Sequence, residues 1–301
     1  MNHLYLCSAQ QKRYLALLED AALPDLQITE EISTANIILA DPPKLAPDLD
    51  KAKNLKWLQS TFAGCDALLT KPRSDYQLTN VRGIFGPLMS EYVFGQLLAL
   101  TRHFPIYRKA QRQSLWSPVP YQGLTGKCIV ILGTGSIGAH VASTARHFGM
   151  QVIGVSRSGK AVQGFDKIIT NANITEAFSK ADVIVSVLPS TLETKGLLNQ
   201  NTLSACNQAI LFNVGRGPVL EEEGLLEAIE GGNIQHAVLD VFSKEPLTPE
   251  HPFWTHPSIT ITPHISAESF PEQVFGIFVD NYMRWLNNEP LSYQMDFSLG
   301  Y

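Results

Sequence analysis

Hydrophobic residues occur along this chain in short runs, and the segments between the runs mix apolar and charged positions. The runs are rich in valine, isoleucine and leucine, for example at 129–132 and 209–214. Such near-continuous apolar runs are typical of strands buried on both faces of a parallel sheet. Several of the intervening segments carry apolar residues at helical spacing. This alternation of strands and helices predicts an α/β protein with doubly wound parallel sheets.

The first 88 residues are expected to form a small α/β unit. A turn at 61–66 is expected to lead into a short helix, and such a turn presents backbone N–H groups that can hold a carboxylate. The predicted strands of this unit are 4–7, 37–40 and 55–60, and its predicted helix is 11–23.

A long helix is expected after this unit, from residue 91 to about residue 113, with Ser90 as its N-cap. The dipeptide Gly86-Pro87 is expected to break the chain before it. The following stretch, 114–126, is predicted to be a loop, and it contains aromatic residues. These side chains suit an oligomer interface, and they suit packing within the chain equally well.

From Lys127 onward the alternation of strands and helices becomes regular. Helices are expected at 139–148, after the first of these strands, and at 266–286, near the end of the chain. The region that carries this series is therefore expected to be inserted between the N-terminal unit and a returning C-terminal helix. Its predicted strands are 128–132, 151–155, 182–188, 209–214, 236–241 and 259–262.

The strongest functional signal is the stretch CIVILGTGSIG at 128–138. A buried strand leads into a GxGxxG turn, and a helix follows, which is the dinucleotide-binding fingerprint. Gly133 permits the tight turn, Gly135 lets the backbone approach a pyrophosphate, and Gly138 lets the helix pack close to the strand. The free N–H groups at the helix N-terminus favour the phosphates.

The end of the next strand indicates which nucleotide binds. An NAD site usually has an aspartate or glutamate there, which bonds to the ribose hydroxyls. This chain has Ser156-Arg157-Ser158-Gly159-Lys160, without an acid. Arg157 can stack on adenine and pair with a 2′-phosphate, and Ser156 and Ser158 can donate hydrogen bonds to it. A solvated basic loop is the alternative explanation, but beside the fingerprint this loop favours NADPH.

Composition narrows the class of protein. The chain is 45% hydrophobic and 17% charged, which is ordinary for a globular protein, and its 301 residues suffice for two domains. A net charge of −5 argues against a nucleic-acid or anionic-membrane surface. The four cysteines are far apart and form no CxxC motif, so we expect them to be free thiols in a reducing compartment. No group of cysteines and histidines has the spacing of a metal site. Without a signal peptide or a membrane-length apolar run, a cytoplasmic protein is expected.

Three ionisable residues stand just beyond strand ends on the expected ligand edge, namely Arg216, Glu245 and His264. Each alone has an ordinary explanation, as a helix cap, a solvated turn residue or a loop histidine. Together they match hydride transfer to a 2-oxo acid, which needs a cation for the carboxylate and carbonyl oxygen and an acid for the new alkoxide. Arginine suits the first role through its bidentate fork, and histidine suits the second because it titrates near neutrality. A carboxylate behind the histidine would orient the ring and favour its charged form.

These motifs resemble those of the D-isomer-specific 2-hydroxyacid dehydrogenase family over nearly the whole chain. The resemblance implies a Rossmann-type doubly wound parallel sheet inserted into a smaller flavodoxin-like α/β substrate domain. We expect the substrate-binding domain at 1–89 and 268–301 and the NADP-binding domain at 90–267. The matching stretches are GTGSIG at 133–138, LPST at 188–191, NVGRGPV at 213–219, LDVFSKEP at 239–246 and ITPHISA at 261–267.

The resemblance also implies roles for individual residues. It makes Arg216 a substrate-binding residue, Glu245 the support of the histidine, and His264 the acid/base that also contacts substrate. Ala63-Gly64 is expected to bind the substrate carboxylate.

The resemblance further implies that Asp240 meets the nicotinamide carboxamide and that the chain forms a homodimer through its nucleotide domain. No nucleic-acid, membrane or metal partner is expected. The residues predicted to lie at the cofactor are Gly133, Gly135, Ser136, Ile137, Gly138, Ser156, Arg157, Ser158, Leu188, Pro189, Val214, Gly215, Arg216, Asp240 and His264.

Within the family the chain is most similar to the NADPH-dependent glyoxylate/hydroxypyruvate reductases. The similarity lies in the Ser156-Arg157-Ser158 loop, in EYVFGQLLALTRHFPIY at 91–107 and in WTHPSITITPHISA at 254–267. The sequence therefore predicts an NADPH-dependent reductase of small 2-oxo acids such as glyoxylate or hydroxypyruvate. Two alternatives stay open: a reductase of a bulkier 2-oxo acid, and a nucleotide-sensing binding protein with little turnover.

Overall fold

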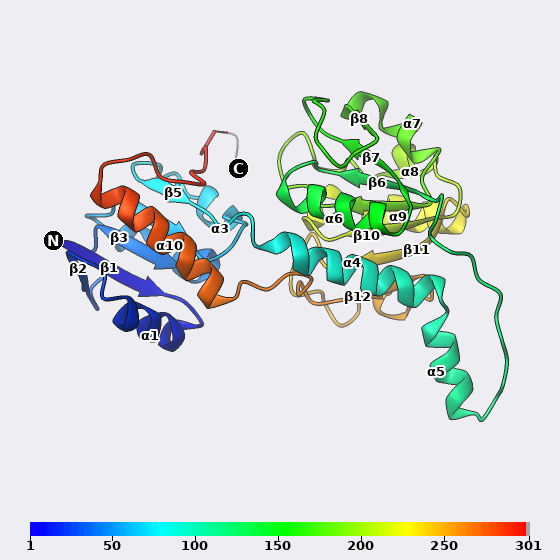
Figure 1. Ribbon diagram of the computed structural model, residues 1–301, viewed down its shortest axis with the longest axis horizontal. Helices are drawn as coiled ribbons and strands as arrows, with labels where there is room; N and C mark the ends of the chain where they lie inside the picture. The colour runs from blue at the N-terminus through cyan, green and yellow to red at the C-terminus, as the bar shows by residue number, and fades with distance from the viewer. Residues whose placement is uncertain (299–301) are drawn as a thin grey trace. The chain divides into compact units, whose positions relative to one another are not determined.

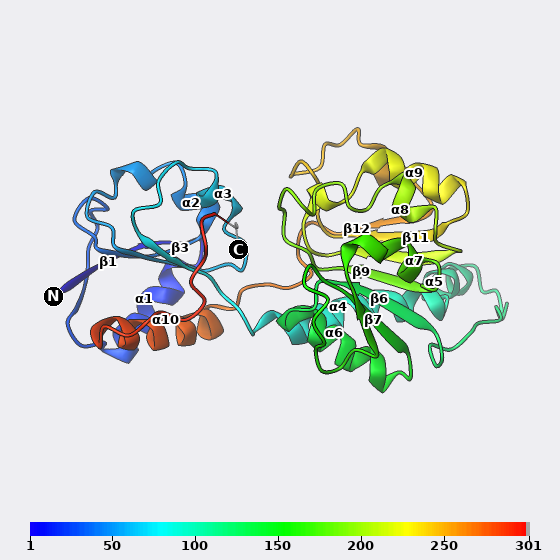
Figure 2. The same ribbon diagram turned by 90° about the horizontal axis from the view of Figure 1, so that it is seen from above.

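The computed structural model describes residues 1–298 and divides the chain into two compact units. The smaller unit contains Met1–Ile84 together with the C-terminal segment that begins at Ser269, and the larger unit is Phe85–Glu268. Each unit has its own parallel sheet (Figure 1, Figure 2). The predicted fold class, α/β with one doubly wound unit inserted into another, is confirmed. No helix in the described part of the chain is long and apolar enough to cross a membrane.

The smaller unit is built on a five-stranded parallel sheet with the order β2-β1-β3-β4-β5. This is the flavodoxin-like order, in which the winding direction changes beside the first strand. The sequence pattern does not predict β2 or β5, because three residues are too few to display a periodicity. The strands are β1 (Asn2–Cys7), β2 (Leu26–Ile28), β3 (Ile37–Ala40), β4 (Trp57–Ser60) and β5 (Gln77–Thr79).

Helices cover both faces of this sheet (Figure 2). On one face α1 contacts α10, and Trp57 of β4 stacks on Phe278 of α10 with ring centroids 5.4 Å apart. On the other face α2, η1 and α3 share a hydrophobic core with β3 and β4. The elements are α1 (Gln11–Ala21), α2 (Pro42–Leu45), η1 (Leu49–Lys51), α3 (Asp66–Leu69) and α10 (Pro271–Leu286).

The larger unit is built on a seven-stranded parallel sheet with the order β12-β11-β10-β9-β6-β7-β8. The chain starts in the middle at β6, winds outward to β8, and then returns to wind outward on the other side from β9. In doubly wound sheets, ligands bind beyond the carboxyl ends of the strands at such a reversal, which here lies between β6 and β9. The strands are β6 (Cys128–Leu132), β7 (Gln151–Val155), β8 (Lys167–Ile169), β9 (Val183–Ser186), β10 (Ala209–Asn213), β11 (Ile234–Leu239) and β12 (Ile259–Ile261).

A hydrophobic core lies on each face of this second sheet. One core joins α4 and α6 to the sheet, and the other joins α7, α8 and α9 to the opposite face. Burial in the second core raises the pKa of Cys206 to about 12, which keeps it a thiol. The helices are α4 (Phe85–Thr101), α5 (Phe104–Arg112), α6 (Ser136–His147), α7 (Ile174–Phe178), α8 (Gln200–Leu203) and α9 (Glu222–Glu230), with 3-10 turns η2 (Asn171–Asn173), η3 (Gly217–Val219) and η4 (Pro252–Thr255).

The predicted single helix at 91–113 is wrong in both its start and its continuity. Helix α4 begins at Phe85, because the dipeptide Gly86-Pro87 lies in its first turn, where the missing proline N–H costs no hydrogen bond. Ser90 is therefore not an N-cap; its hydroxyl lies 2.8 Å from His140 Nδ1 of α6. The helix then breaks at His103, whose φ of 58° is left-handed, and α5 begins at Phe104 with Pro105 in its first turn.

The last helix also starts later than the predicted position. Helix α10 begins at Pro271, and residues 266–270 are not helical. The Ser266 N–H is bonded to the Asp240 carboxylate at 2.9 Å, which commits that stretch to a turn.

Candidate active site

The glycine turn after β6 has the shape that a bound pyrophosphate requires. Gly133 has a φ of +100°, which disfavours other residues, and a Cβ on Gly138 would lie 1.9 Å from the Gly133 carbonyl oxygen. Among the described residues nothing lies within 4 Å of the place where a Cβ of Gly135 would stand. Helix α6 begins at Ser136, not at the predicted residue 139, so the N–H groups of Ser136 and Ile137 belong to its first turn. These residues fit a dinucleotide.

The loop after β7 contains the three residues that are predicted to bind the 2′-phosphate of NADPH. Ser156 Oγ accepts a hydrogen bond from the Gly159 N–H at 3.2 Å, and Ser158 Oγ accepts one from the Lys160 N–H at 3.3 Å. Since both hydroxyls act as acceptors in these bonds, their own protons can be donated elsewhere. Arg157 is exposed between them. The loop therefore offers one guanidinium and two hydroxyl donors at the ribose end of the sheet edge.

The turn that carries Arg216 is packed tightly against two other loops. Cβ atoms on Gly215 and Gly217 would lie 2.5 Å from the Leu188 oxygen and 1.9 Å from the Phe242 carbonyl carbon. Glycine at both positions lets the turn fit between the segments that follow β9 and β11. Asn213 at the end of β10 donates from Nδ2 to the Arg216 carbonyl at 3.1 Å. The structure thus brings the predicted cofactor segments 188–189 and 214–216 together.

His264 and Glu245 form a direct pair in the larger unit. His264 Nδ1 and Glu245 Oε2 are 2.8 Å apart, and the other carboxylate oxygen accepts the Phe242 N–H at 2.9 Å. Because the carboxylate accepts from Nδ1, Nε2 is the ring nitrogen left for chemistry. The His264 side chain is 51% exposed, so a ligand has access to the ring.

Asp240, by contrast, has no exposed surface. Its Oδ1 accepts hydrogen bonds from Thr262 Oγ1 at 2.6 Å and from the Ile265 N–H at 2.9 Å, and its Oδ2 accepts the Ser266 N–H. The carboxylate oxygens are therefore already bonded to donors from the same unit. Its predicted contact with the nicotinamide carboxamide stays a prediction.

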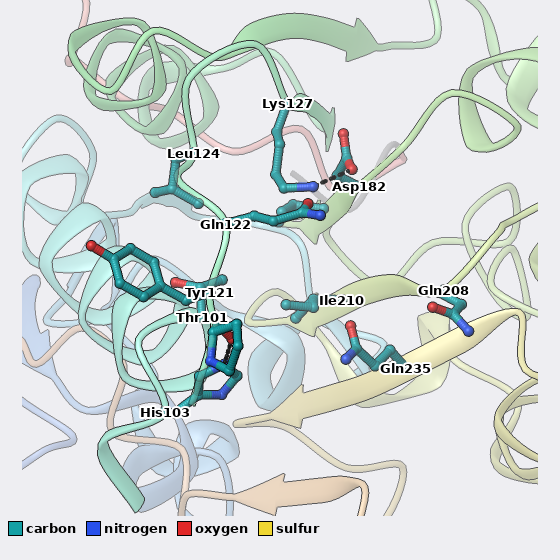
Figure 3. Close-up of a pocket in the computed structure, with 12 residues that line it drawn as sticks. Thr101, His103, Tyr121, Gln122, Leu124, Lys127, Asp182, Gln208, Ile210 and Gln235 are labelled. Atoms are coloured by element: carbon teal, nitrogen blue, oxygen red, sulfur yellow. Dashed lines mark hydrogen bonds and ion pairs between the residues drawn. The ribbon is translucent and has the colours of Figure 1, made fainter. Parts of the chain in front are cut away.

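A cavity of about 340 Å³ lies at the other edge of the larger sheet (Figure 3). It is lined by residues at the amino ends of strands, by the end of α4 and by the segment after α5. Its charged residues neutralise each other, since Lys127 Nζ is 2.9 Å from Asp182 Oδ1. Ligands of doubly wound sheets bind at the carboxyl ends of the strands. The candidate active site is therefore the edge that carries the glycine turn and His264.

Comparison with known proteins decides which family has this arrangement. The family model described as D-isomer specific 2-hydroxyacid dehydrogenase, NAD binding domain, matches residues 94–266, which is more than half of the chain. The chain belongs to this family. The family recognised from the sequence motifs is thereby confirmed, as is the enzyme class, an oxidoreductase with a nucleotide-binding domain.

Relatives of this dehydrogenase match it along most of their length. Glyoxylate/hydroxypyruvate reductase A of Klebsiella pneumoniae is 32% identical over 260 residues, covering 83% of each chain. A crystal structure of a D-isomer specific 2-hydroxyacid dehydrogenase family protein from Aeromonas salmonicida is 50% identical, with a TM-score of 0.94 over 98% of this chain and 99% of that one. The NADPH-dependent glyoxylate/hydroxypyruvate reductase of Sinorhizobium meliloti, solved with NADP and sulfate, is 25% identical, with a TM-score of 0.88 over 100% of both chains.

The predicted carboxylate-binding residues of the dehydrogenase, Ala63 and Gly64, belong to the smaller unit. They lie in the loop between β4 and α3, where Asn80 Nδ2 donates to the Ala63 carbonyl at 2.8 Å. Thr61, the first residue of this loop, donates from Oγ1 to Asp41 Oδ1 at 2.6 Å, and both side chains are buried. The loop is therefore held from two sides. Its role in binding the substrate carboxylate stays a prediction.

The sequence pattern does not single out Asp41 and Asn80 as supports of that loop. Asp41 directly follows β3, so the rule that functional groups follow strand ends could have found it. Asn80 directly follows β5, which the pattern does not predict, so no signal pointed to it.

Proposed function

We propose that this dehydrogenase reduces small 2-oxo acids such as glyoxylate and hydroxypyruvate with NADPH, and that His264 is the proton donor. The observation that carries the proposal is the 2.8 Å hydrogen bond between His264 Nδ1 and Glu245 Oε2 at the ligand edge of the nucleotide-binding sheet. The tightly packed Arg216 turn supports it, because its glycines place it against the loop that leads to Glu245. The names of the Klebsiella and Sinorhizobium relatives support the choice of substrate class.

NADP(H) is the cofactor. The Sinorhizobium reductase was solved with NADP, and the family model that matches this chain is a dinucleotide-binding domain. We assign the 2′-phosphate to Arg157, Ser156 and Ser158, because their loop contains no acid and offers a guanidinium with two hydroxyl donors. We assign the pyrophosphate to the N–H groups at the start of α6.

Arg216, His264 and Glu245 have different roles in the proposed reduction. When bound, the nicotinamide supplies the hydride that adds to C2 of the 2-oxo acid. Arg216 binds the substrate through its planar guanidinium and stabilises the negative charge that develops on the carbonyl oxygen. His264 donates a proton from Nε2 to that oxygen, which becomes the hydroxyl group of the product. Glu245 holds the ring by Nδ1 and stabilises the imidazolium until the proton leaves.

Initial rates test this proposal. The purified protein is assayed with NADPH and NADH against glyoxylate, hydroxypyruvate, pyruvate and phenylpyruvate. We expect the highest kcat/KM with NADPH as the cofactor and with glyoxylate or hydroxypyruvate as the substrate. A preference for phenylpyruvate would replace the proposal with a reductase of bulkier 2-oxo acids. Tight NADPH binding without turnover of any 2-oxo acid would indicate a nucleotide-sensing protein.

Glu245→Gln is expected to move the pH profile in a definite direction. Reduction takes a proton from His264, and the charged Glu245 carboxylate lies 2.8 Å from Nδ1 of that ring. Glutamine keeps the size of the side chain and an acceptor oxygen but removes the charge. The loss of reduction activity at alkaline pH should therefore begin at a lower pH, and oxidation of the hydroxy acid, which needs the neutral ring, should tolerate a lower pH.

The measurement for this prediction is kcat/KM against pH in both directions, for wild type and variant. Glu250→Gln changes an exposed glutamate of the following loop and serves as the control, with the profile of the wild type expected. An alkaline limb of Glu245→Gln that stays in place or moves to higher pH would mean that Glu245 does not act on His264 through its charge.

The homodimer implied by the family resemblance is part of the proposal. Helix α5 has no buried residue among those described, and Figure 1 shows α5 and the segment after it extending away from the rest of the larger unit. This arm, residues 104–123, exposes Ile106 by 50%, Leu115 by 56% and Trp116 by 99%. Apolar side chains so exposed on a projecting segment are typical of a surface covered by a second chain.

Charged substitutions in the arm should therefore separate the subunits. We expect the double substitution Ile106→Asp and Trp116→Asp to lower the mass in sedimentation or light scattering from twice the chain mass to the 33.2 kDa of one chain. Met283→Asp changes an exposed apolar residue on α10 of the smaller unit and should leave the dimer intact. A wild-type protein that sediments as a monomer at micromolar concentration would refute the dimer.

A further inference from the structure

One residue, Asp240, accepts several hydrogen bonds from the turn that carries His264. The Asp240 carbonyl accepts the His264 N–H at 2.8 Å, and its carboxylate accepts the N–H groups of Ile265 and Ser266, both at 2.9 Å. Three consecutive backbone donors therefore bond to Asp240. Such support matters here, because His264 has a left-handed φ of 53°, a backbone conformation that is uncommon for a residue other than glycine.

The same carboxylate is connected to helix α4. Thr262 Oγ1 lies 2.6 Å from Asp240 Oδ1 and 2.6 Å from the Tyr92 hydroxyl of α4. A threonine hydroxyl has one proton, and the carboxylate takes it, so the Tyr92 hydroxyl must donate to Thr262. Both hydrogen bonds therefore point the same way: the Tyr92 hydroxyl donates to Thr262, and the Thr262 hydroxyl donates to Asp240. Burial raises the pKa of Tyr92 to about 12, so the phenol keeps its proton at neutral pH.

Burial makes each donor to this carboxylate important. Asp240 has no exposed surface, so water does not replace a lost hydrogen bond, and an unsatisfied buried acceptor is costly. Removing the Thr262 hydroxyl would leave Oδ1 with the Ile265 N–H as its only remaining partner among the bonds described above. The carboxylate would then shift toward other donors and take the His264 turn with it.

We propose that Tyr92 and Thr262 are positioning residues that hold the His264 imidazole against Glu245 by fixing the Asp240 carboxylate under the turn. The inference rests on the proposed function, because it assigns these two hydroxyls to the alignment of the proton donor. Neither residue is placed in contact with substrate. The chain of hydrogen bonds lies wholly within the larger unit and joins α4, β11 and the turn after β12.

The test compares Thr262→Val, Thr262→Ser and Tyr92→Phe. Thr262→Val keeps the shape of the side chain but removes the hydroxyl, and we expect kcat for reduction to fall by about 10- to 100-fold, the scale of a small misplacement of a catalytic group. Tyr92→Phe should cost about tenfold at most, the equivalent of one lost neutral hydrogen bond. Thr262→Ser should restore most of the wild-type rate. NADPH affinity, measured by fluorescence, should stay close to that of the wild type in all three.

Thr260→Val is the matched control. It removes a hydroxyl from β12, the strand that ends just before Thr262, where Thr260 Oγ1 lies 2.9 Å from His236 Nε2. We expect it to lower thermal stability without changing kcat or the pH profile. The pH profile separates positioning from stability, because Thr262→Val should move the alkaline limb of reduction to lower pH. That shift should be smaller when Glu245 is already glutamine, since both changes then act on one contact.

Hydrogen exchange of the peptide that contains residues 262–267 gives a readout that needs no turnover. The N–H groups bonded to Asp240 should exchange faster in Thr262→Val than in wild type or Thr260→Val. Faster exchange in a protein that reduces no 2-oxo acid would support the positioning device and refute the proposed function. Wild-type exchange, kcat and pH profile in Thr262→Val would refute the inference while leaving the proposed function intact. A loss of NADPH affinity equal to the loss of kcat would also refute it, because these residues would then act on the cofactor.

Discussion

His264→Ala should lower kcat for reduction by about 10²- to 10⁴-fold, the usual contribution of a positioned general acid. The affinity for NADPH should hardly change, because the ring is proposed to act on the substrate oxygen and not on the nucleotide. The geometry supports this division of roles. Glu245 engages Nδ1 at 2.8 Å and leaves Nε2, in a side chain that is 51% exposed, for the substrate.

The measurement is single-turnover or steady-state reduction of glyoxylate together with a fluorescence titration of NADPH. His147→Ala is the control, since His147 is an exposed histidine at the end of α6 whose Nδ1 contacts the Ser143 carbonyl of its own helix. It should retain the wild-type rate. A His264→Ala enzyme with a near-normal kcat would eliminate His264 as the proton donor, whatever the substrate.

Arg157→Asp should weaken NADPH binding by at least about 1.5–3 kcal/mol, the value of a lost hydrogen bond to a charged group. Aspartate removes the guanidinium that we pair with the 2′-phosphate, and its own charge repels that phosphate. NADH has no 2′-phosphate, so its affinity should not fall, and it should rise if the new carboxylate bonds to the ribose hydroxyls as in NAD sites. The cofactor preference should therefore move toward NADH.

Lys160→Asp is the charge-matched control for that experiment. It makes the same change of charge within the same loop, but only the backbone N–H of Lys160 has a described bond there, to Ser158 Oγ. A general electrostatic effect would weaken NADPH binding equally in both variants, and a specific pairing would make Arg157→Asp much the larger. If the wild type used NADH as well as NADPH, the assignment of this loop to a 2′-phosphate would be wrong.

Strands and the glycine turn are the parts of this fold that local sequence reveals. Each long strand of the larger unit is a run of apolar residues, and the GxGxxG turn needs glycine for reasons that act within a few residues. The short strands β2, β5 and β8 were not predicted, since three residues carry too little periodicity. The start of α4 was predicted wrongly because Gly86-Pro87 has two interpretations. Proline and glycine break the interior of a helix, but they are tolerated in its first turn.

The site divides in the same way. The rule that ligands bind at the carboxyl ends of parallel strands, taken with the chemistry of hydride transfer, marked Arg216, Glu245 and His264 as candidates in the sequence. It did not reveal that Glu245 bonds to His264 Nδ1, nor that the Arg216 turn packs against Phe242. Those contacts depend on how separate loops approach one another.

By itself, then, the sequence determined the α/β class, the nucleotide turn, the family and the candidate ionisable residues, because periodicity, turn chemistry and strand ends are local properties of the chain. The family resemblance implied that Glu245 supports His264, but only the tertiary structure showed through which atoms they meet and which other residues hold them. Tyr92 and Thr262 are 170 positions apart, yet their oxygens are 2.6 Å apart, and Asp240 is buried beneath a turn that lies more than 20 residues later. Such contacts depend on the packing of whole elements. The donors to a buried carboxylate can therefore be identified only when that packing is known.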